Sequence, residues 1–504
     1  MRWFFAIGLM WWSGWVSAQD LPKAAQQWSI DQQAIHVANR LGYGITPALL
    51  NHIKTIGISA YIEQQLNPSE LPLAALPNQP IGLYASAAAG DQLLQQFTHY
   101  QADPELVRQG QPLSVQRQKM VRQKTTEYQQ AKLLRAIYSP RQLEERLVDF
   151  WFNHFNVFAG VDYTGLLIQH YEDTALRPVV FGRFSDLLQA TAQHAAMSTY
   201  LNNRVNRREQ TFKNGHRVGI NENYARELLE LHTVGLDAGY TQADIRALAQ
   251  VLTGWGFDIT GQRNRPPLFY FDAKQHQAQP QVVLGQTIGA DVGDGEQFLA
   301  WLAGHPLTAQ RMSHKLAVYF VADQPPAPLV AQMTQTFLQS QGDLSAVLRV
   351  MFYSDAFWSR QSVQQKFKTP YEYVVSSVRL ADVQPQNVRY LVYTLQQMNM
   401  PIYGCLTPDG YPATAAAWKN AYALSQRFEL AKKIGGGVIA LDTGVVASVP
   451  EVRHAQRQRF QPHANRMQET IISILSDNTT EVLRQAPKQM RAGLLLSSPE
   501  FLYQ

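Results

Sequence analysis

The chain has 504 residues, a formal net charge of +5 at pH 7 and a single cysteine, Cys405. This length is ample for a large hydrophobic core, and one cysteine excludes an intramolecular disulfide framework, so packing must stabilise the fold. The basic charge is mild and scattered, without a run of five like charges, which argues against nucleic acid as a partner.

The amino-terminal residues predict a secretory signal peptide over 1–18. Arg2 supplies a positive charge, and the apolar run FFAIGLMWWSGWV behind it is too short to span a bilayer comfortably. Small residues before the end of this segment suit a signal peptidase, and Gln19 and Asp20 end the apolar run, against the alternative of an uncleaved anchor. We expect cleavage after Ala18, no membrane span in the mature chain, and export to the periplasm or the extracellular space.

Most of the remaining chain spaces its apolar residues at intervals of three and four, which is typical of amphipathic helices. The expected helices are 31–41, 46–66, 113–137, 140–156, 161–175, 184–200, 221–234, 241–254, 294–303, 306–321, 327–339, 343–353, 370–381, 411–433 and 464–476. Irregular connections are expected at 67–90, 202–220, 256–267 and 434–461.

One stretch has strand character. LFYFDAKQHQAQPQVVLG, residues 268–285, places two β-rich pieces around a polar turn and predicts a small hairpin. No fixed-period repeat is present, so a solenoid is excluded. We therefore predict a mainly α fold in which residues 19–504 form a single large multi-helical globular domain with one small β-hairpin insertion near 268–285. Within it, 434–461 is a loop and 462–504 a C-terminal helical segment.

Seven stretches resemble motifs of one bacterial family. They are HVANRLGYG (36–44), RLVDFWFNHFNV (146–157), NENYARELLELHTVG (221–235) followed by YTQADIRALAQVLTGW (240–255), HPLTAQRMSHKLAVYFV (305–321), KTPYEYVVSSVRL (368–380) and YPATAAAWKNAYALSQRFELA (411–431). The chain resembles, over about 31–433, the family catalogued as domain of unknown function 1800. The resemblance implies an exported, largely helical protein without an established activity. Its implied partner is an exported protein of the domain of unknown function 1501 family, which resembles alkaline phosphatases and sulfatases.

The chain departs from that family at three polar positions. Asn202 stands where the family tends to have aspartate, and Gln277 and Gln281 stand where it often has an aspartate and a lysine after His276. If either of the two charges missing after His276 takes part in chemistry, the activity of this member is impaired or altered.

The segment 221–235 is the candidate site with the most polar groups. At 100° per residue, Glu222, Arg226, Glu230, Asn223 and Glu227 share one helix face, and leucines fill the opposite one. One interpretation is a solvated face whose i, i+4 pairs are each worth about 0.2–0.5 kcal/mol. The other is a carboxylate cluster with an orienting arginine, in which crowding raises at least one carboxyl pKa and creates a general acid.

On the second interpretation, the candidate catalytic residues are Glu222, Arg226, Glu227 and His276. The face carries no lysine and includes the short amide of Asn223, which favours a fixed, inward-facing cluster. We expect it to face the loop 202–219 and the segment around His276. His276 itself is expected in the exposed turn of the predicted hairpin.

The loop 202–219 is the most basic stretch and leads into the amino end of the 221–234 helix. It carries five cations against one carboxylate: Arg204, Arg207, Arg208, Lys213 and Arg217 against Glu209. Helix amino termini attract anions, so the candidate substrate-binding residues are Arg204, Arg207, Asn221 and Asn223. A solvated loop without a ligand is the alternative.

Two histidines follow the apolar spacing of their helices. We expect His154 and His232 to form a structural polar core, buried, neutral and hydrogen-bonded, whereas His36 lies with Arg40 on a polar face. Standard catalytic and cofactor motifs are absent, among them HExxH, CxxCH, GxSxG and the Walker loop. Metal and cofactor are therefore unknown.

Two functions remain open from the sequence. The first is an exported enzyme, hydrolase-like, acting on an envelope or extracellular polymer through the Glu/Arg/His cluster of the 221–232 helix. The second is a non-catalytic binding or maturation partner of another exported protein, phosphatase- or sulfatase-like.

Overall fold

The computed structural model describes most of the chain. The described residues are 20–73, 76, 92, 95–211, 215, 217–257, 269–385, 387–439 and 462–504. The expected signal peptide and nearly all of the expected 434–461 loop lie outside them.

Helices dominate the described chain, so the predicted mainly α class is confirmed. The helices are α1 (Ile30–Arg40), α2 (Pro47–Ile56), α3 (Ile58–Leu66), α5 (Pro104–Arg108), α6 (Leu113–Tyr138), α7 (Gln142–His154), α8 (Thr164–Tyr171), α9 (Phe184–Ala192), α10 (Ala195–Tyr200), α11 (Asn223–Glu227), α12 (Gln242–Val251), α13 (Val292–Ala303), α14 (Pro306–Phe320), α15 (Ala327–Gln339), α16 (Leu344–Phe352), α17 (Pro370–Leu380), α18 (Arg389–Gln397), α19 (Ala415–Trp418), α20 (Ala421–Gly435), α22 (Ala464–Ile471), α23 (Asp477–Gln485), α24 (Lys488–Leu496) and α25 (Pro499–Leu502). Short π-helical turns follow α8 at Glu172–Leu176 and α11 at Leu228–His232.

Three antiparallel strand pairs are present in the described residues. They are β1 (Gln210–Thr211) with β2 (Arg217–Val218), β3 (Trp255–Gly256) with β4 (Tyr270–Phe271), and β5 (Gln281–Val283) with β6 (Gln286–Ile288). A small hairpin is present near the expected segment, at β5–β6, but the two β-rich pieces that were expected to form it do not pair with each other. Its turn residues Leu284 and Gly285 both have positive φ, at 49° and 76°, as a two-residue hairpin turn requires. The first β-rich piece, β4, pairs with β3 instead.

Several expected helices are interrupted where the backbone cannot continue. Gly57, with φ of 88°, separates α2 from α3 within the expected 46–66 helix. His194 separates α9 from α10, because its Nδ1 accepts the amide hydrogen of Ala196 and begins a new helix. α18 lies where no helix was expected.

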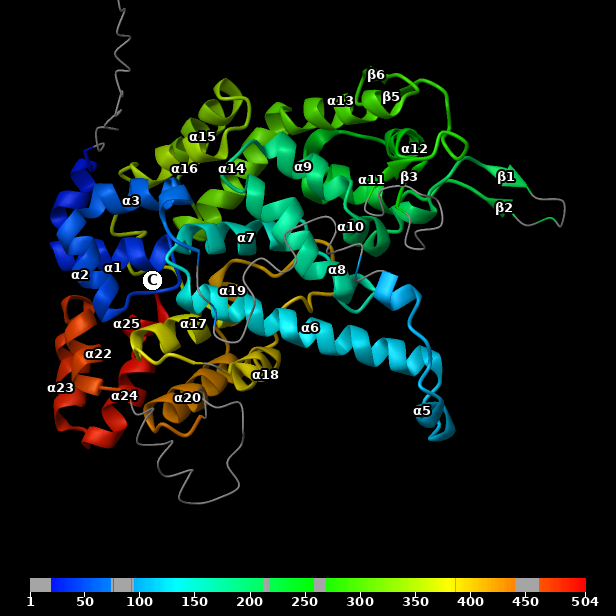
Figure 1. Ribbon diagram of the computed structural model, residues 1–504. Coiled ribbons are helices and arrows are strands. Elements are labelled where there is room, and N and C mark those ends of the chain that lie inside the picture. The colour runs from blue at the N-terminus through cyan, green and yellow to red at the C-terminus, as the bar shows by residue number, and fades with distance from the viewer. Residues whose placement is uncertain are drawn as a thin grey trace, which may run out of the picture.

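The helix α7 lies near the centre of the molecule, with α6 crossing on one side and α9 and α14 on the other (Figure 1). Nearly all of α7 is buried, and every residue of α17 is buried as well. The helices from both ends of the chain lie side by side, where Gln32 of α1 donates a hydrogen bond of 3.0 Å to the carbonyl of Ser473. The β1–β2 pair projects from the body.

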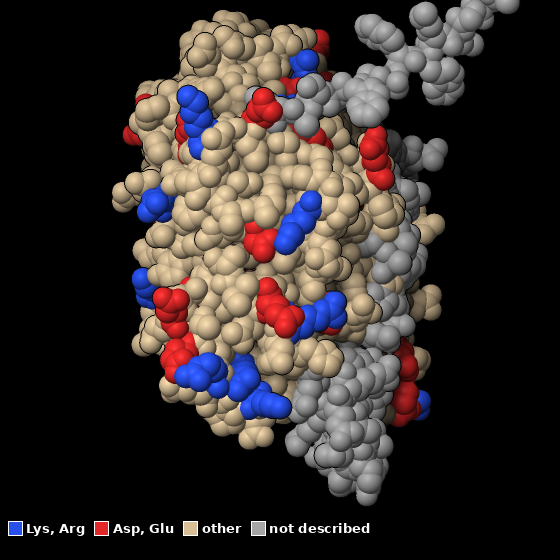
Figure 2. Space-filling view, turned by 90° about the vertical axis from the view of Figure 1, so that its left-hand side faces the viewer, with Lys and Arg blue, Asp and Glu red and all other residues tan. Residues whose placement is uncertain are grey.

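The charged side chains on the face formed by α1–α3 and α22–α24 are scattered, and many of the cations lie beside a carboxylate (Figure 2). Lys54 and Asp31 illustrate this, with 2.6 Å between their charged groups. No helix among the described residues has the length and apolar content needed to cross a membrane.

Candidate functional site

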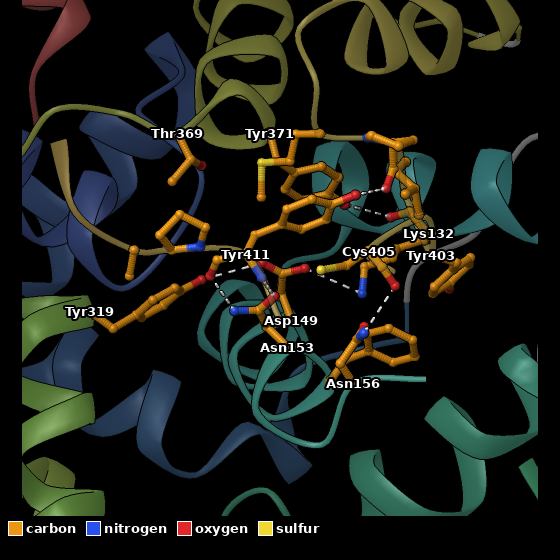
Figure 3. Close-up of a pocket in the computed structure, with 16 residues that line it drawn as sticks. Lys132, Asp149, Asn153, Asn156, Tyr319, Thr369, Tyr371, Tyr403, Cys405 and Tyr411 are labelled. Atoms are coloured by element: carbon orange, nitrogen blue, oxygen red, sulfur yellow. Dashed lines mark hydrogen bonds and ion pairs between the residues drawn. The ribbon is translucent and has the colours of Figure 1, made fainter. Parts of the chain in front are cut away.

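A pocket forms where four helices meet one irregular segment. Its walls come from α6, α7, α14, the start of α17 and the segment 399–414. The space that a water-sized group can enter is about 50 Å³, enough for a few water molecules or for one functional group of a larger ligand. Figure 3 shows Tyr319 reaching the pocket from the side opposite Lys132 and Tyr403.

Asp149 of α7 is the carboxylate of this pocket. Its Oδ1 lies 3.3 Å from Nζ of Lys132, and the hydroxyl of Tyr319 donates to its Oδ2 over 3.5 Å. Burial raises the pKa of Asp149 and the nearby charge of Glu172 adds to this, although Lys132 and Arg146 act in the opposite direction. Since its side chain is still 22% exposed, Asp149 combines a raised pKa with access to the pocket.

Lys132 is held in place from behind the pocket. Its Nζ donates to Oε2 of Glu172 over 3.0 Å, and the hydroxyl of Tyr403 donates to the same oxygen over 3.0 Å. Burial would lower the pKa of Lys132, but the charges of Glu172 and Asp149 raise it, so the lysine stays charged. The ammonium also lies 4.9 Å from the centre of the Phe152 ring. A fixed positive charge therefore stands beside Asp149.

The segment 399–414 is fastened to α7 and to the residues just after it. Asn156 donates to the carbonyls of Cys405 and Thr407 over 3.1 and 2.8 Å. Asn153 exchanges two hydrogen bonds with the backbone of Tyr411, whose hydroxyl in turn donates to the carbonyl of Pro401. These contacts place the Tyr411 ring in the pocket wall.

The polar face of the 221–232 helix lies at the surface. Arg226 lies 3.4 Å from Glu222 and 3.6 Å from Glu230, and their side chains are 37%, 27% and 23% exposed. Arg226 and Glu222 also bind Gln242, at the start of α12. Among the described residues, these side chains contact α12 and neither the loop 202–219 nor His276, so the expected orientation is wrong. The physical reason is that α12 begins beside this face, where Gln242 is a hydrogen-bond partner of both Glu222 and Arg226.

Glu227 is the third carboxylate of that face. Partial burial raises its pKa, and the charges of Glu230 and Asp409 add to the effect. Asp409 belongs to the segment 399–414, so Glu227 interacts electrostatically with the segment that forms the pocket wall. Its catalytic role stays a prediction.

His276 is buried, not exposed as expected. Its Nδ1 lies 2.8 Å from the carbonyl of Thr253 and 3.1 Å from the hydroxyl of the same residue. The reason is that β4 pairs with β3, which folds the following residues back onto the end of α12. Gly254, with φ of 80°, permits this approach, because a Cβ there would lie 3.2 Å from Cβ of His276. His276 does not meet Glu222 or Arg226.

The four candidate substrate-binding residues do not converge. Arg204 pairs with Asp162 over 2.6 Å at the surface, and Nε of Arg207 donates to the carbonyl of Val205 over 3.4 Å. Asn221 caps the next turn by accepting from the amide of Asn223 over 3.1 Å. None of the four lines the pocket described above.

His154 and His232 are both buried, with ring centres 6.0 Å apart. His154 Nδ1 lies 2.8 Å from Nζ of Lys315, and its Nε2 lies 3.1 Å from the carbonyl of His232. Nε2 therefore donates and Nδ1 accepts. Burial and the neighbouring Lys315 lower the pKa of both imidazoles, that of His232 to about 3.

His36 is a correction to the expectation of a polar helix face. Both His36 and Arg40 are buried, and Nε2 of His36 lies 3.0 Å from the carbonyl of Phe357. The apparent polar face of α1 meets backbone carbonyls of the segment 357–362, to which Arg40 also donates.

The pocket residues were not recognised from the sequence, although several of them lie in motifs already distinguished. Asp149 and Asn153 belong to 146–157, Tyr319 to 305–321, Tyr371 to 368–380 and Tyr411 to 411–431. The signal was the joint occurrence of polar and tyrosine residues in separate motifs, which only the fold brings together. Among the described residues, no group of three or more His, Cys, Asp or Glu side chains could hold a metal ion.

The fold and site define a large α-helical protein with a pocket assembled from motifs distant in the sequence. The chain belongs to the family described as "Protein of unknown function (DUF1800)", whose model matches residues 36–503. The match continues past the last quoted motif into α25. No curated protein and no solved structure matches the chain.

Proposed function

We propose that this protein is an exported enzyme that performs acid–base chemistry, most simply hydrolysis, on a hydroxyl-rich envelope or extracellular polymer. The reacting group of one polymer unit would enter the pocket, the rest of the unit would lie at its mouth, and Asp149 would carry the proton. The observation that supports this most is the Asp149 carboxyl itself, which faces the pocket with a raised pKa beside a fixed ammonium.

The lining of the pocket suits a sugar-like unit. Four tyrosines, Tyr319, Tyr371, Tyr403 and Tyr411, contribute to the walls together with Phe152. Aromatic side chains offer apolar faces to ring hydrogens, and tyrosine adds a hydroxyl group at its tip. A pocket that is mostly apolar with a few polar groups is the usual form of a small-molecule site.

Asp149 has hydrogen-bonding capacity left for a ligand. Its contacts of 3.3 Å to Lys132 and 3.5 Å to Tyr319 are longer than the roughly 2.7–2.9 Å of strong charge-assisted bonds. In the hydrolytic step, the protonated carboxyl gives its proton to the leaving oxygen of the scissile bond. Water adds its hydroxyl to the other fragment and returns a proton to Asp149. Lys132 stabilises the carboxylate between these two transfers.

The experiment uses the purified mature chain with chito-oligosaccharides and alginate oligosaccharides. New reducing ends report cleavage, and calorimetry reports binding. Asp149→Asn keeps the shape of the pocket, so we expect saturable binding to persist while cleavage falls at least 100-fold. The exposed Asp186→Asn serves as the matched control and should leave both unchanged.

Two outcomes would contradict the assignment of Asp149. If Glu227→Gln or Arg226→Ala lost cleavage while Asp149→Asn stayed fully active, the acid–base chemistry would be assigned to the 221–232 helix, as one interpretation of the sequence predicts. Absence of binding and cleavage with all probes would remove the enzyme proposal. Co-purification with an exported phosphatase- or sulfatase-like protein would then favour the alternative of a binding or maturation partner.

A further inference from the structure

A second group of polar side chains lies next to the pocket along the same two helices. Lys315 and Tyr319 are four residues apart on α14 and therefore lie on one face, about one helical turn from each other. Tyr319 points to Asp149, whereas Lys315 points to His154, at the end of α7. This second group takes no part in the function proposed above.

Two cations of this group lack a counterion. Among the described residues, neither Arg311 nor Lys315 forms an ion pair with a carboxylate, and the one hydrogen-bond partner of Lys315 is Nδ1 of His154 at 2.8 Å. Nε of Arg311 is buried without a partner. Burial lowers the pKa of both cations. The charge of Asp409 opposes this for Lys315 and that of Asp237 for Arg311, although neither carboxylate forms an ion pair with the cation.

His232 adds an independent observation. Its side chain is 1% exposed, and neither Nδ1 nor Nε2 has a hydrogen-bond partner among the described residues. Leaving a buried polar group unpaired costs about 1–3 kcal/mol, so an imidazole with two unpaired nitrogens calls for a ligand or ordered water. His232 ends a π-helical turn, a local distortion that is frequent at functional sites. The charges of Lys315 and Arg311 both act on it.

We propose that Arg311, Lys315 and His232 bind an anionic group, a carboxylate or a phosphate. The guanidinium of Arg311 offers paired N–H donors, which suit the oxygens of such groups. Lys315 keeps two N–H donors after its bond to His154, and His232 can donate one N–H. His154 acts as a positioning residue, because its Nδ1 accepts from Lys315 and its Nε2 binds the backbone of His232.

The test measures binding of inorganic phosphate and, separately, of glucuronate to the full mature chain by calorimetry. Saturable binding of either probe is expected, and the better probe identifies the class of anion. Arg311→Gln and Lys315→Met should each weaken it at least tenfold, whereas Lys315→Arg should retain it. Arg108→Gln, at an exposed and remote cation, is the matched control and should bind as the wild type does.

A measurement on the wild-type chain does not depend on how the variants fold. Nitrogen resonances of the His232 ring should shift as the probe is added, because a ring N–H gains an acceptor. Unchanged His232 resonances at saturating probe, or binding that is equal in all variants, would overturn the proposal. Asp149→Asn should leave anion binding intact, so failure here and failure of the proposed enzyme function are distinguishable.

Discussion

Asn153 and Tyr411 hold each other by two hydrogen bonds of 2.7 Å, one from the Asn153 amide to the Tyr411 carbonyl and one from the Tyr411 amide to Asn153 Oδ1. This reciprocal pair joins α7 to a segment more than 250 residues away in the sequence. It fixes the wall of the pocket to the helix that carries Asp149. The position of Tyr411 therefore depends on one amide side chain and on the backbone that approaches it.

Gly410 makes this approach possible, and Gly410→Ala should disrupt it. Its φ is 75°, and a Cβ there would lie 2.2 Å from the backbone oxygen of Asn153. Because backbone cannot yield as a side-chain tip does, we expect a loss of more than about 2 kcal/mol in unfolding free energy. Urea denaturation measures this loss, and proteolysis within 399–414 should become faster.

Gly239→Ala is the matched control for this substitution. Its φ is 73°, but nothing lies within 4 Å of an added Cβ. It carries the backbone strain without the clash, so its cost should stay near 1 kcal/mol. Equal losses in the two variants would show that the contact with Asn153 does not matter.

Lys132 and Arg226 provide a contrast between a buried and a surface cation. Lys132→Met removes the charge that binds Glu172 and Asp149, and stranding buried carboxylates costs about 3–5 kcal/mol. Arg226→Ala removes two partly exposed ion-pair contacts of 3.4 and 3.6 Å and a surface hydrogen bond of 3.0 Å to Gln242, which are together worth about 1 kcal/mol. The inward-facing cluster expected from the sequence would instead give Arg226→Ala a cost of more than about 2 kcal/mol in unfolding free energy. Unfolding free energies of the two variants in the opposite order would contradict the structure.

The same contrast shows what the sequence could and could not predict. Apolar spacing located the long helices, because core contacts repeat with the helical period. It could not predict that Arg146 and Asp149, on the polar side of α7, would be covered by α6, α14 and α17. The spacing reports only that a face is polar, and a buried ion network has the same pattern as a solvated face. The partner of β4 was likewise not encoded locally.

The candidate site was missed for the same physical reason. The helix 221–232 carries many charged residues in one segment, which the sequence shows directly. Lys132, Asp149 and Tyr319 lie in three different helices, so the sequence does not show them as a group. Their chemistry depends on distances that arise from packing of distant segments. Among the sequence candidates, Glu227 has a carboxyl pKa that burial and the charge of Glu230 raise, and a distant residue, Asp409, adds to this.

The buried pair of Glu372 and Arg146 should make stability depend on pH. Burial would raise the pKa of Glu372, but Arg146 and the amide of Thr369 outweigh this and lower it from 4.5 to about 2. A carboxyl whose pKa is lower in the folded chain than in the unfolded chain stabilises the fold at pH values above the unfolded pKa. This stabilisation is lost as pH falls from about 4.5 toward 2. Its size is on the order of 3 kcal/mol.

Glu372→Gln isolates this contribution. Urea unfolding at pH 7 should show the variant to be several kcal/mol less stable, because Arg146 is left without its counterion. The difference in unfolding free energy from wild type should shrink as pH falls below 4.5, because protonation of Glu372 then removes its stabilising contribution in the wild type. A difference that stays constant between pH 7 and pH 3 would refute the role of the charge.

Asp149→Asn should have the opposite effect on stability, which separates a functional carboxyl from a structural one. The pKa of Asp149 is raised, so its ionised form is disfavoured in the folded chain, and that cost grows as pH rises above its ordinary value of 3.8. Asparagine removes the cost, and Lys132 keeps Glu172 as its partner. We expect unfolding free energy at pH 7 to stay within about 1 kcal/mol of wild type or to increase, as it does when an active-site group is replaced. At pH 4 the two chains should converge. A loss above about 2 kcal/mol at pH 7 would show that Asp149 serves the fold, and the proposed proton carrier would have to be sought elsewhere in the pocket.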